Sequence, residues 1–189
     1  MANAIPEPSP PRDLSISLAA ANLYTLAISV PLVAVLFTLY AAFSPNPGPV
    51  RIPSPLEMLF FVVTLVLGIL LHELIHGLGW AYFAQLPLRR IRFGFLARTM
   101  TPYAHALDPM PARSYRLGTA LPALLLGAMP FVVGTILGRP AIALFGTVFS
   151  FAAGGDLLVL WVIRNVHPAA MVLDHPSRAG CLVVNNREE

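Results

Sequence analysis

The chain has 189 residues, of which 57% are hydrophobic and only 11% are charged, whereas soluble domains carry about 25% charged residues. This composition excludes an ordinary soluble domain and favours a small, single-domain membrane protein, while the single Cys181 excludes an internal disulfide framework. The formal net charge is +3, and the clustering of basic residues in one loop is typical of membrane orientation rather than of nucleic-acid binding.

The chain begins with residues 1–15, which hold four prolines and no apolar periodicity and therefore predict a disordered tail. Four apolar stretches follow, each long enough to cross a bilayer. They cover residues 16–43, 56–85, 117–137 and 141–163. Pro31 lies inside the first stretch and should kink that helix without ending it. The sequence thus predicts an all-α membrane domain of about four transmembrane helices over 16–163, followed by a tail over 164–189.

The connections between these stretches differ in character. Residues 44–55 hold five prolines, which predict a stiff connection outside the membrane. Residues 138–140 predict a tight turn. The long connection, 86–116, is the polar part of the chain. Apolar and other residues alternate over 91–95, which predicts a short strand or β-hairpin there. A second short strand is predicted over Leu182–Val184 in the tail.

The long connection also predicts the orientation of the chain. It carries half of the twelve basic residues, namely Arg89, Arg90, Arg92, Arg98, Arg113 and Arg116. Positive charge marks cytoplasmic loops, so this loop is expected in the cytoplasm. Four spans then place both termini in the cytoplasm as well.

The second apolar stretch carries the motif His72-Glu73-Leu74-Ile75-His76. Two histidines at i and i+4 lie on one helical face and can bind a single metal ion, and the intervening Glu73 can hold and deprotonate a metal-bound water. Such side chains are costly at membrane depth, which favours a functional role. The alternative for Glu73 is an ion pair with a nearby arginine.

A catalytic zinc usually has three protein ligands and an open position. Asp156 is the first candidate for the third ligand because it lies in the fourth stretch at a depth similar to that of the motif. Its alternative role is that of a helix-packing carboxylate. His105 is the second candidate, with substrate positioning or oxyanion stabilisation as its other roles. The remaining candidates are Asp108, His167, Asp174 and His175.

These residues predict one Zn²⁺ per chain, which lowers the pKa of bound water and polarises a carbonyl. Glu73 would act as the general base on the zinc-bound water and pass its proton to the leaving amine. His/carboxylate ligation suits zinc well but does not exclude another divalent ion.

The motif and the later aspartate resemble those of membrane-embedded zinc metalloproteases, a group that includes the site-2 proteases. Residues 71–77 and Gly155-Asp156 match its two elements, although the later motif here is Gly-Gly-Asp-Leu and no PDZ module is present. The chain resembles more closely a bacterial zincin-peptidase family of unknown function. That resemblance covers about 56–184 and includes residues 109–116, Asp174-His175-Pro176 and Gly180-Cys181. It implies a peptidase of the bacterial cytoplasmic membrane.

Three functions are compatible with these features. The first is a membrane-embedded zinc metallopeptidase that cleaves a membrane protein or peptide substrate. The second is a catalytically silent, metalloprotease-like membrane scaffold or regulator. The third is a metal carrier or a permease component, and a permease would be expected to have polar residues along a path and repeated halves. No nucleic-acid partner is expected, and the sequence leaves the oligomeric state open.

Overall fold

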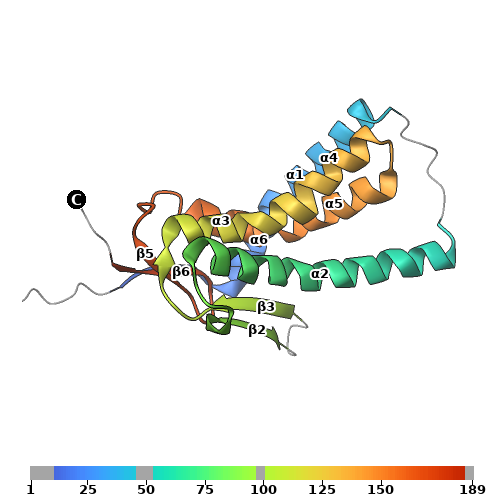
Figure 1. The fold of residues 1–189 in the computed structure, drawn as a ribbon. Helices are drawn as coiled ribbons and strands as arrows, with labels where there is room; N and C mark the ends of the chain where they lie inside the picture. Colours follow the sequence, from blue (N-terminus) through green and yellow to red (C-terminus); the bar gives the residue numbers. More distant parts are fainter. Residues whose placement is uncertain (1–10, 46–52, 97–100, 186–189) are drawn as a thin grey trace, which may run out of the picture.

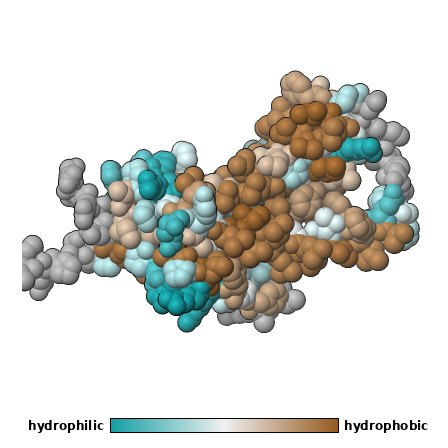
Figure 2. Space-filling view, viewed as in Figure 1, coloured by the Kyte–Doolittle hydropathy of each residue, from teal (hydrophilic) through white to brown (hydrophobic). Residues whose placement is uncertain are grey.

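The structure is a computed structural model that describes residues 11–45, 53–96 and 101–185. It is mostly helical, with long apolar helices on one side and small antiparallel sheets at the other end (Figure 1). Hydrophobic residues cover the helices, and most hydrophilic residues gather around the sheets (Figure 2). The molecule therefore has an apolar part and a polar end.

The first two helices are the longest. Helix α1 (Leu18–Phe43) runs through Pro31 without ending, as predicted. Helix α2 (Pro55–Ala84) begins with a capping box, in which Ser54 Oγ accepts the Glu57 N–H and the Glu57 carboxylate accepts the Ser54 N–H. It ends at Gln85, whose φ of 54° is left-handed and turns the chain away from the helix axis.

The remaining helices form two further apolar units. Helix α3 (Ala112–Pro122), the π-helical segment η2 (Ala123–Ala128) and helix α4 (Met129–Ile136) follow one another without a gap. Helices α5 (Pro140–Ala152) and α6 (Gly154–Val162) meet at an angle of 42°. The described residues thus contain three helices long and apolar enough to cross a membrane, or four if the bent pair forms one span.

Many apolar side chains on these helices face outward. Leu56, Phe60 and Phe43 are each more than 70% exposed. Exposure of apolar surface to water costs about 25 cal/mol per Å², so a surface of this kind is suited to a hydrocarbon environment. These long apolar helices are those expected of a membrane protein.

A four-stranded antiparallel sheet lies at the polar end and has the order β1-β6-β5-β4. Its strands are β1 (Arg12–Ile16), β4 (Met110–Pro111), β5 (Met171–Asp174) and β6 (Ala179–Asn185). The protein is mostly helical, as predicted, but the sheet shows that it is not all-α. Strand β1 stands where a disordered tail is predicted for residues 12–15, and residues 1–10 lie outside the described part. The strand predicted at Leu182–Val184 is confirmed within β6. The sheet includes the pairing of β1 with β6. These strands lie at opposite ends of the chain, so a local sequence pattern does not predict their pairing.

A separate hairpin packs against α2. The short 3₁₀ helix η1 (Leu88–Arg90) leads into β2 (Ile91–Leu96), which pairs antiparallel with β3 (Thr101–Ala106). This pairing confirms the predicted hairpin, although Arg98 lies outside the described residues. A Cβ added at Gly77 would lie 2.3 Å from Phe93 Cζ, so the hairpin touches α2 where the helix has no side chain. Figure 1 shows β2 and β3 running alongside the C-terminal half of α2.

The main hydrophobic core lies where α2, α3 and the four-stranded sheet meet. Trp80, Tyr115, Met110, Val172 and Cys181 are buried in this core. The burial of Cys181 raises the pKa of its thiol to about 12, so it is an unreactive core residue. The core anchors the C-terminal half of α2, which carries the HExxH motif.

Candidate metal centre

The two motif histidines lie on one face of α2, as their spacing requires. Their Nε2 atoms are 3.2 Å apart. The side chains of His72 and His76 are only 11% and 7% exposed. Two nearly buried imidazoles with their nitrogens directed at one point form a pair that can bind one metal ion.

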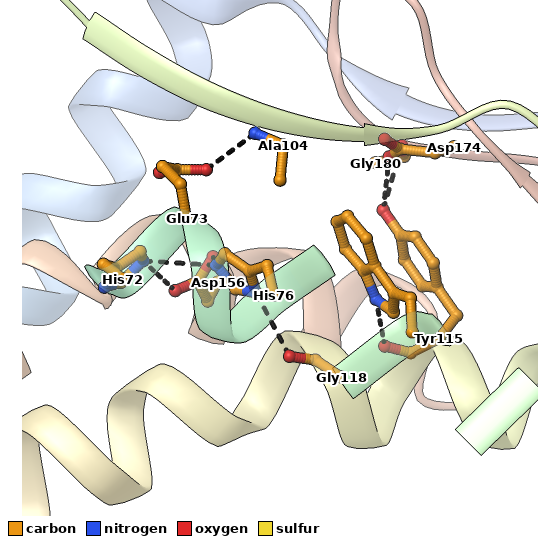
Figure 3. Close-up of polar contacts among 10 residues, drawn as sticks. His72, Glu73, His76, Ala104, Tyr115, Gly118, Asp156, Asp174 and Gly180 are labelled. Carbon is orange, nitrogen blue, oxygen red and sulfur yellow. Dashed lines mark hydrogen bonds and ion pairs between the residues drawn. The ribbon is translucent and has the colours of Figure 1, made fainter. Parts of the chain in front are cut away.

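Helix α6 brings Asp156 to the same point. Asp156 Oδ2 lies 3.2 Å from His72 Nε2, and Asp156 Oδ1 lies 3.2 Å from His76 Nε2 (Figure 3). One ligand atom from each of the three residues lies within 4.8 Å of the others. Asp156 thus meets two histidines that precede it by at least 80 positions in sequence.

The orientation of His76 is set by its other ring nitrogen. His76 Nδ1 lies 3.1 Å from the carbonyl oxygen of Gly118 on α3. A carbonyl only accepts hydrogen bonds, so Nδ1 carries a proton and Nε2 is the nitrogen available for a metal ion. The His76 ring also stacks on Trp80, whose indole N–H donates to the Tyr115 carbonyl at 3.1 Å. These contacts hold the imidazole in a ligand-ready orientation.

Glu73 contacts the hairpin rather than an arginine. Its Oε2 accepts a hydrogen bond from the Ala104 N–H of β3 at 2.8 Å (Figure 3). Within the described part of the chain, Glu73 forms no ion pair with an arginine, so the alternative role considered for it is not supported. The carboxylate lies beside the histidine pair and is held by a backbone donor.

His105 lies outside this cluster, on strand β3 of the hairpin. Its Nδ1 is 2.7 Å from Asp174 Oδ2 on β5, and the Tyr115 hydroxyl donates to Asp174 Oδ1 at 2.8 Å. The hydrogen bond to Asp174 raises the pKa of the His105 imidazole above its usual value. Neighbouring residues of a strand point to opposite faces, so His105 and Ala104 lie on different faces of β3. The geometry favours Asp156 over His105 as the third ligand.

The other predicted ligand candidates have local partners. Asp108 forms an ion pair with Arg90. The Nδ1 atoms of His167 and His175 accept backbone N–H groups of the turns that follow them. None of these side chains joins the three-residue cluster found among the described residues.

The donor set fits zinc. Asp156 Oδ2 is a buried oxygen with no partner of hydrogen-bonding geometry in the described structure, although His72 Nε2 lies close to it. Two neutral imidazoles and one carboxylate are a ligand set of catalytic zinc sites, which keep a fourth position open. Sequence reasoning did not identify Gly118 or Ala104 as partners, because they act through a backbone C=O and a backbone N–H, which do not depend on the side chain.

One of three comparisons with known proteins gives a match. A family model described as "Putative zincin peptidase" matches residues 65–171, more than half of the chain. The match contains the motif histidines, Glu73 and Asp156, whereas residues 174–176 lie beyond it. The comparisons with curated proteins and with solved structures find no match. The likeness to site-2 proteases stays a prediction. By its match to the family model, the chain belongs to this zincin-peptidase family, whose description indicates a zinc metallopeptidase.

Proposed function

We propose that the chain is a membrane-embedded zinc peptidase in which His72, His76 and Asp156 hold the metal and Glu73 is the general base. The observation that carries this proposal is the meeting of three metal-ligating atoms within 4.8 Å, beside a carboxylate that is anchored on β3. Family membership supports the same chemistry. The substrate class is the backbone of a membrane protein or of a membrane-associated peptide.

The position of the cluster on α2 supports an intramembrane site. His72 lies 12 residues before the end of α2 at Ala84, which corresponds to about 18 Å along the helix at a rise of 1.5 Å per residue. The hydrocarbon core of a bilayer is about 30 Å thick. The motif is therefore well inside a span that begins or ends near Ala84.

The sheet supports an even number of spans. Strand β1 precedes α1 and strand β6 follows α6, yet the two strands pair directly. Strand β4, which lies between α2 and α3, belongs to the same sheet. This pairing supports a position for all three segments on one side of the membrane, with the bent α5–α6 pair as a fourth span. The exposed residues Arg89, Arg92 and Arg113 lie on this side, which the positive-inside rule assigns to the cytoplasm.

In the proposed hydrolysis, the metal would act as a Lewis acid and residues of the chain would transfer the proton and hold the ligands. Zinc supplies a Lewis acid that lowers the pKa of water toward about 7 and polarises the scissile carbonyl. Glu73 takes the proton of the attacking water and passes it to the leaving amine. The Ala104 amide keeps the Glu73 carboxylate turned toward the hairpin side of α2. The Gly118 carbonyl accepts the His76 Nδ1–H, which leaves Nε2 as the atom that would bind the metal.

The test is the metal content of the full chain purified in detergent, together with hydrolysis of a membrane-protein substrate library. The wild type should bind close to one zinc per chain, and both His76→Ala and Asp156→Ala should lose the zinc and all hydrolysis. His167→Ala is the matched control, because that side chain accepts only a local backbone N–H group. Bound zinc without any hydrolysis would instead favour the catalytically silent scaffold. A folded wild type that binds no zinc overturns the proposal.

A further inference from the structure

The break between α5 and α6 directs Asp156 toward the two histidines. The helices meet at 42°, and Asp156 is the third residue of α6. Helix α1 supplies no member of the metal cluster, but it packs against this break. We propose that Ser29 of α1 is a positioning residue, which holds the bend that brings Asp156 to the metal centre. This inference rests on the proposed function.

The first observation is a hydrogen bond between distant parts of the chain. Ser29 is fully buried, and its hydroxyl donates to the Phe151 carbonyl at 3.0 Å. Phe151 lies in the last turn of α5, where a helix end leaves carbonyl groups without helical donors. Hydrocarbon offers no donor in place of water. The Ser29 hydroxyl therefore stabilises the open helix end and, with it, the bend.

The second observation is a close approach of α1 and α6. A Cβ added at Gly154 would lie 2.0 Å from Ser29 Oγ and 2.9 Å from Thr25 Cγ2. A Cβ at the next residue, Gly155, would meet only Thr25 Oγ1 at 3.8 Å, an ordinary contact. Thr25 and Ser29 are one helical turn apart and form one face. Of these two positions, 154 requires glycine for α1 to approach the break between α5 and α6, whereas 155 has room for a side chain.

The break and the ligand are close in sequence, so movement at one displaces the other. Asp156 follows Gly154 by two residues, and its carboxylate oxygens lie 3.2 Å from the nitrogens of His72 and His76. Metal–ligand distances tolerate only about 0.2 Å of deviation. A straighter α5–α6 pair would carry Asp156 away from α2 and weaken metal binding without changing any ligand.

The experiment uses the full chain in detergent and two independent measurements. Zinc affinity is measured by competition with a chelator. The bend is measured as the distance between spin labels on cysteines introduced at the exposed positions Leu144 of α5 and Trp161 of α6. The altered residues are Ser29→Ala and Gly154→Ala. The absorption spectrum of bound Co²⁺ adds a measure of ligand geometry, which a uniform loss of stability does not change.

Two control variants match the changes. Gly155→Ala adds a methyl group beside the break where there is room. Thr38→Ala removes an α1 hydroxyl that bonds only within its own helix, to the Ala34 carbonyl at 2.9 Å. Both controls should keep zinc affinity within about twofold of wild type and leave the label distance unchanged.

Ser29→Ala should weaken zinc binding by about 10- to 100-fold, the range for residues that orient a metal ligand, and should shift the label distance. Gly154→Ala should do the same. A Ser29→Ala label distance equal to that of wild type overturns the role of Ser29, whether or not zinc binds. A wild type that binds no zinc while Ser29→Ala shifts the label distance overturns the proposed function and leaves the role of Ser29 in the bend supported.

Discussion

The Glu73 carboxylate accepts a hydrogen bond of 2.8 Å from the Ala104 amide, which joins the HExxH helix to strand β3 across 31 residues of sequence. The donor is a backbone N–H, which every residue type except proline supplies at position 104. The position of the hairpin on α2 therefore controls the position of the Glu73 carboxylate. That position depends in turn on Gly77, where the hairpin and the helix touch.

Gly77→Val should displace the hairpin. A Cβ at Gly77 would lie 2.3 Å from Phe93 Cζ and 2.8 Å from Ile91 Cγ2, so either the strand or the helix must move. Overpacking of this kind costs about 1–3 kcal/mol of unfolding free energy. Displacement of a catalytic group by about 1 Å costs up to about 100-fold in rate. Thermal unfolding and hydrolysis measure the two effects.

The matched control for Gly77 is Leu78→Val, at the adjacent and 45% exposed position of α2. It should keep both stability and hydrolysis. Full activity in Gly77→Val would show that the hairpin contact does not determine the position of Glu73.

Glu73→Gln should separate metal binding from catalysis. The amide oxygen of glutamine still accepts the Ala104 N–H, so the local structure is kept, but the side chain no longer takes a proton. Loss of a general base costs about 10²–10⁴-fold in rate, whereas the zinc content should equal that of wild type. Metal analysis and hydrolysis of the same preparation test this. Turnover at the wild-type rate would remove Glu73 from the general-base role.

His105→Ala tests which residue completes the metal site. His105 is paired with Asp174 and lies outside the metal cluster, so the variant should keep its zinc. Asp156→Ala should lose it. Zinc affinities of the two purified variants, measured side by side, decide the assignment. The reverse result, with zinc lost in His105→Ala and kept in Asp156→Ala, would assign the third ligand to the hairpin.

The pair of His105 and Asp174 should make the junction between the hairpin and the four-stranded sheet dependent on pH. The hydrogen bond to Asp174 raises the His105 pKa above its unfolded value of about 6.5. A raised pKa stabilises the fold fully below about pH 6.5, and this contribution is lost as the pH rises through the folded-state pKa. Asp174→Asn should lower the His105 pKa, which an NMR titration of the imidazole measures.

The control for this titration is Asp108→Asn, which removes a carboxylate that pairs with Arg90 rather than with His105. It should leave the His105 titration unchanged. An equal His105 pKa in wild type and Asp174→Asn would mean that the ion pair does not persist in solution.

Part of the site could be predicted because its signals are local. His72, Glu73 and His76 lie within five residues, and helical periodicity alone places the two imidazoles on one face. Asp156 was predicted as the third ligand from the cost of a charge at membrane depth, and the structure places it beside both histidines. Its assignment as a ligand stays a prediction. The backbone partners Ala104 and Gly118 could not be predicted, since no residue type marks them.

The sequence by itself determined the apolar helices, the hairpin and the HExxH face, because hydrophobic length and short periodicities act within a few turns of chain. The tertiary structure decided the rest. It paired β1 with β6, placed the Ser29 hydroxyl at the Phe151 carbonyl, and brought Asp156 rather than His105 to the metal cluster. Each of these contacts joins residues at least 80 positions apart. The free energy that these contacts contribute to folding depends on how whole helices and strands pack. A local pattern of residues does not predict that packing.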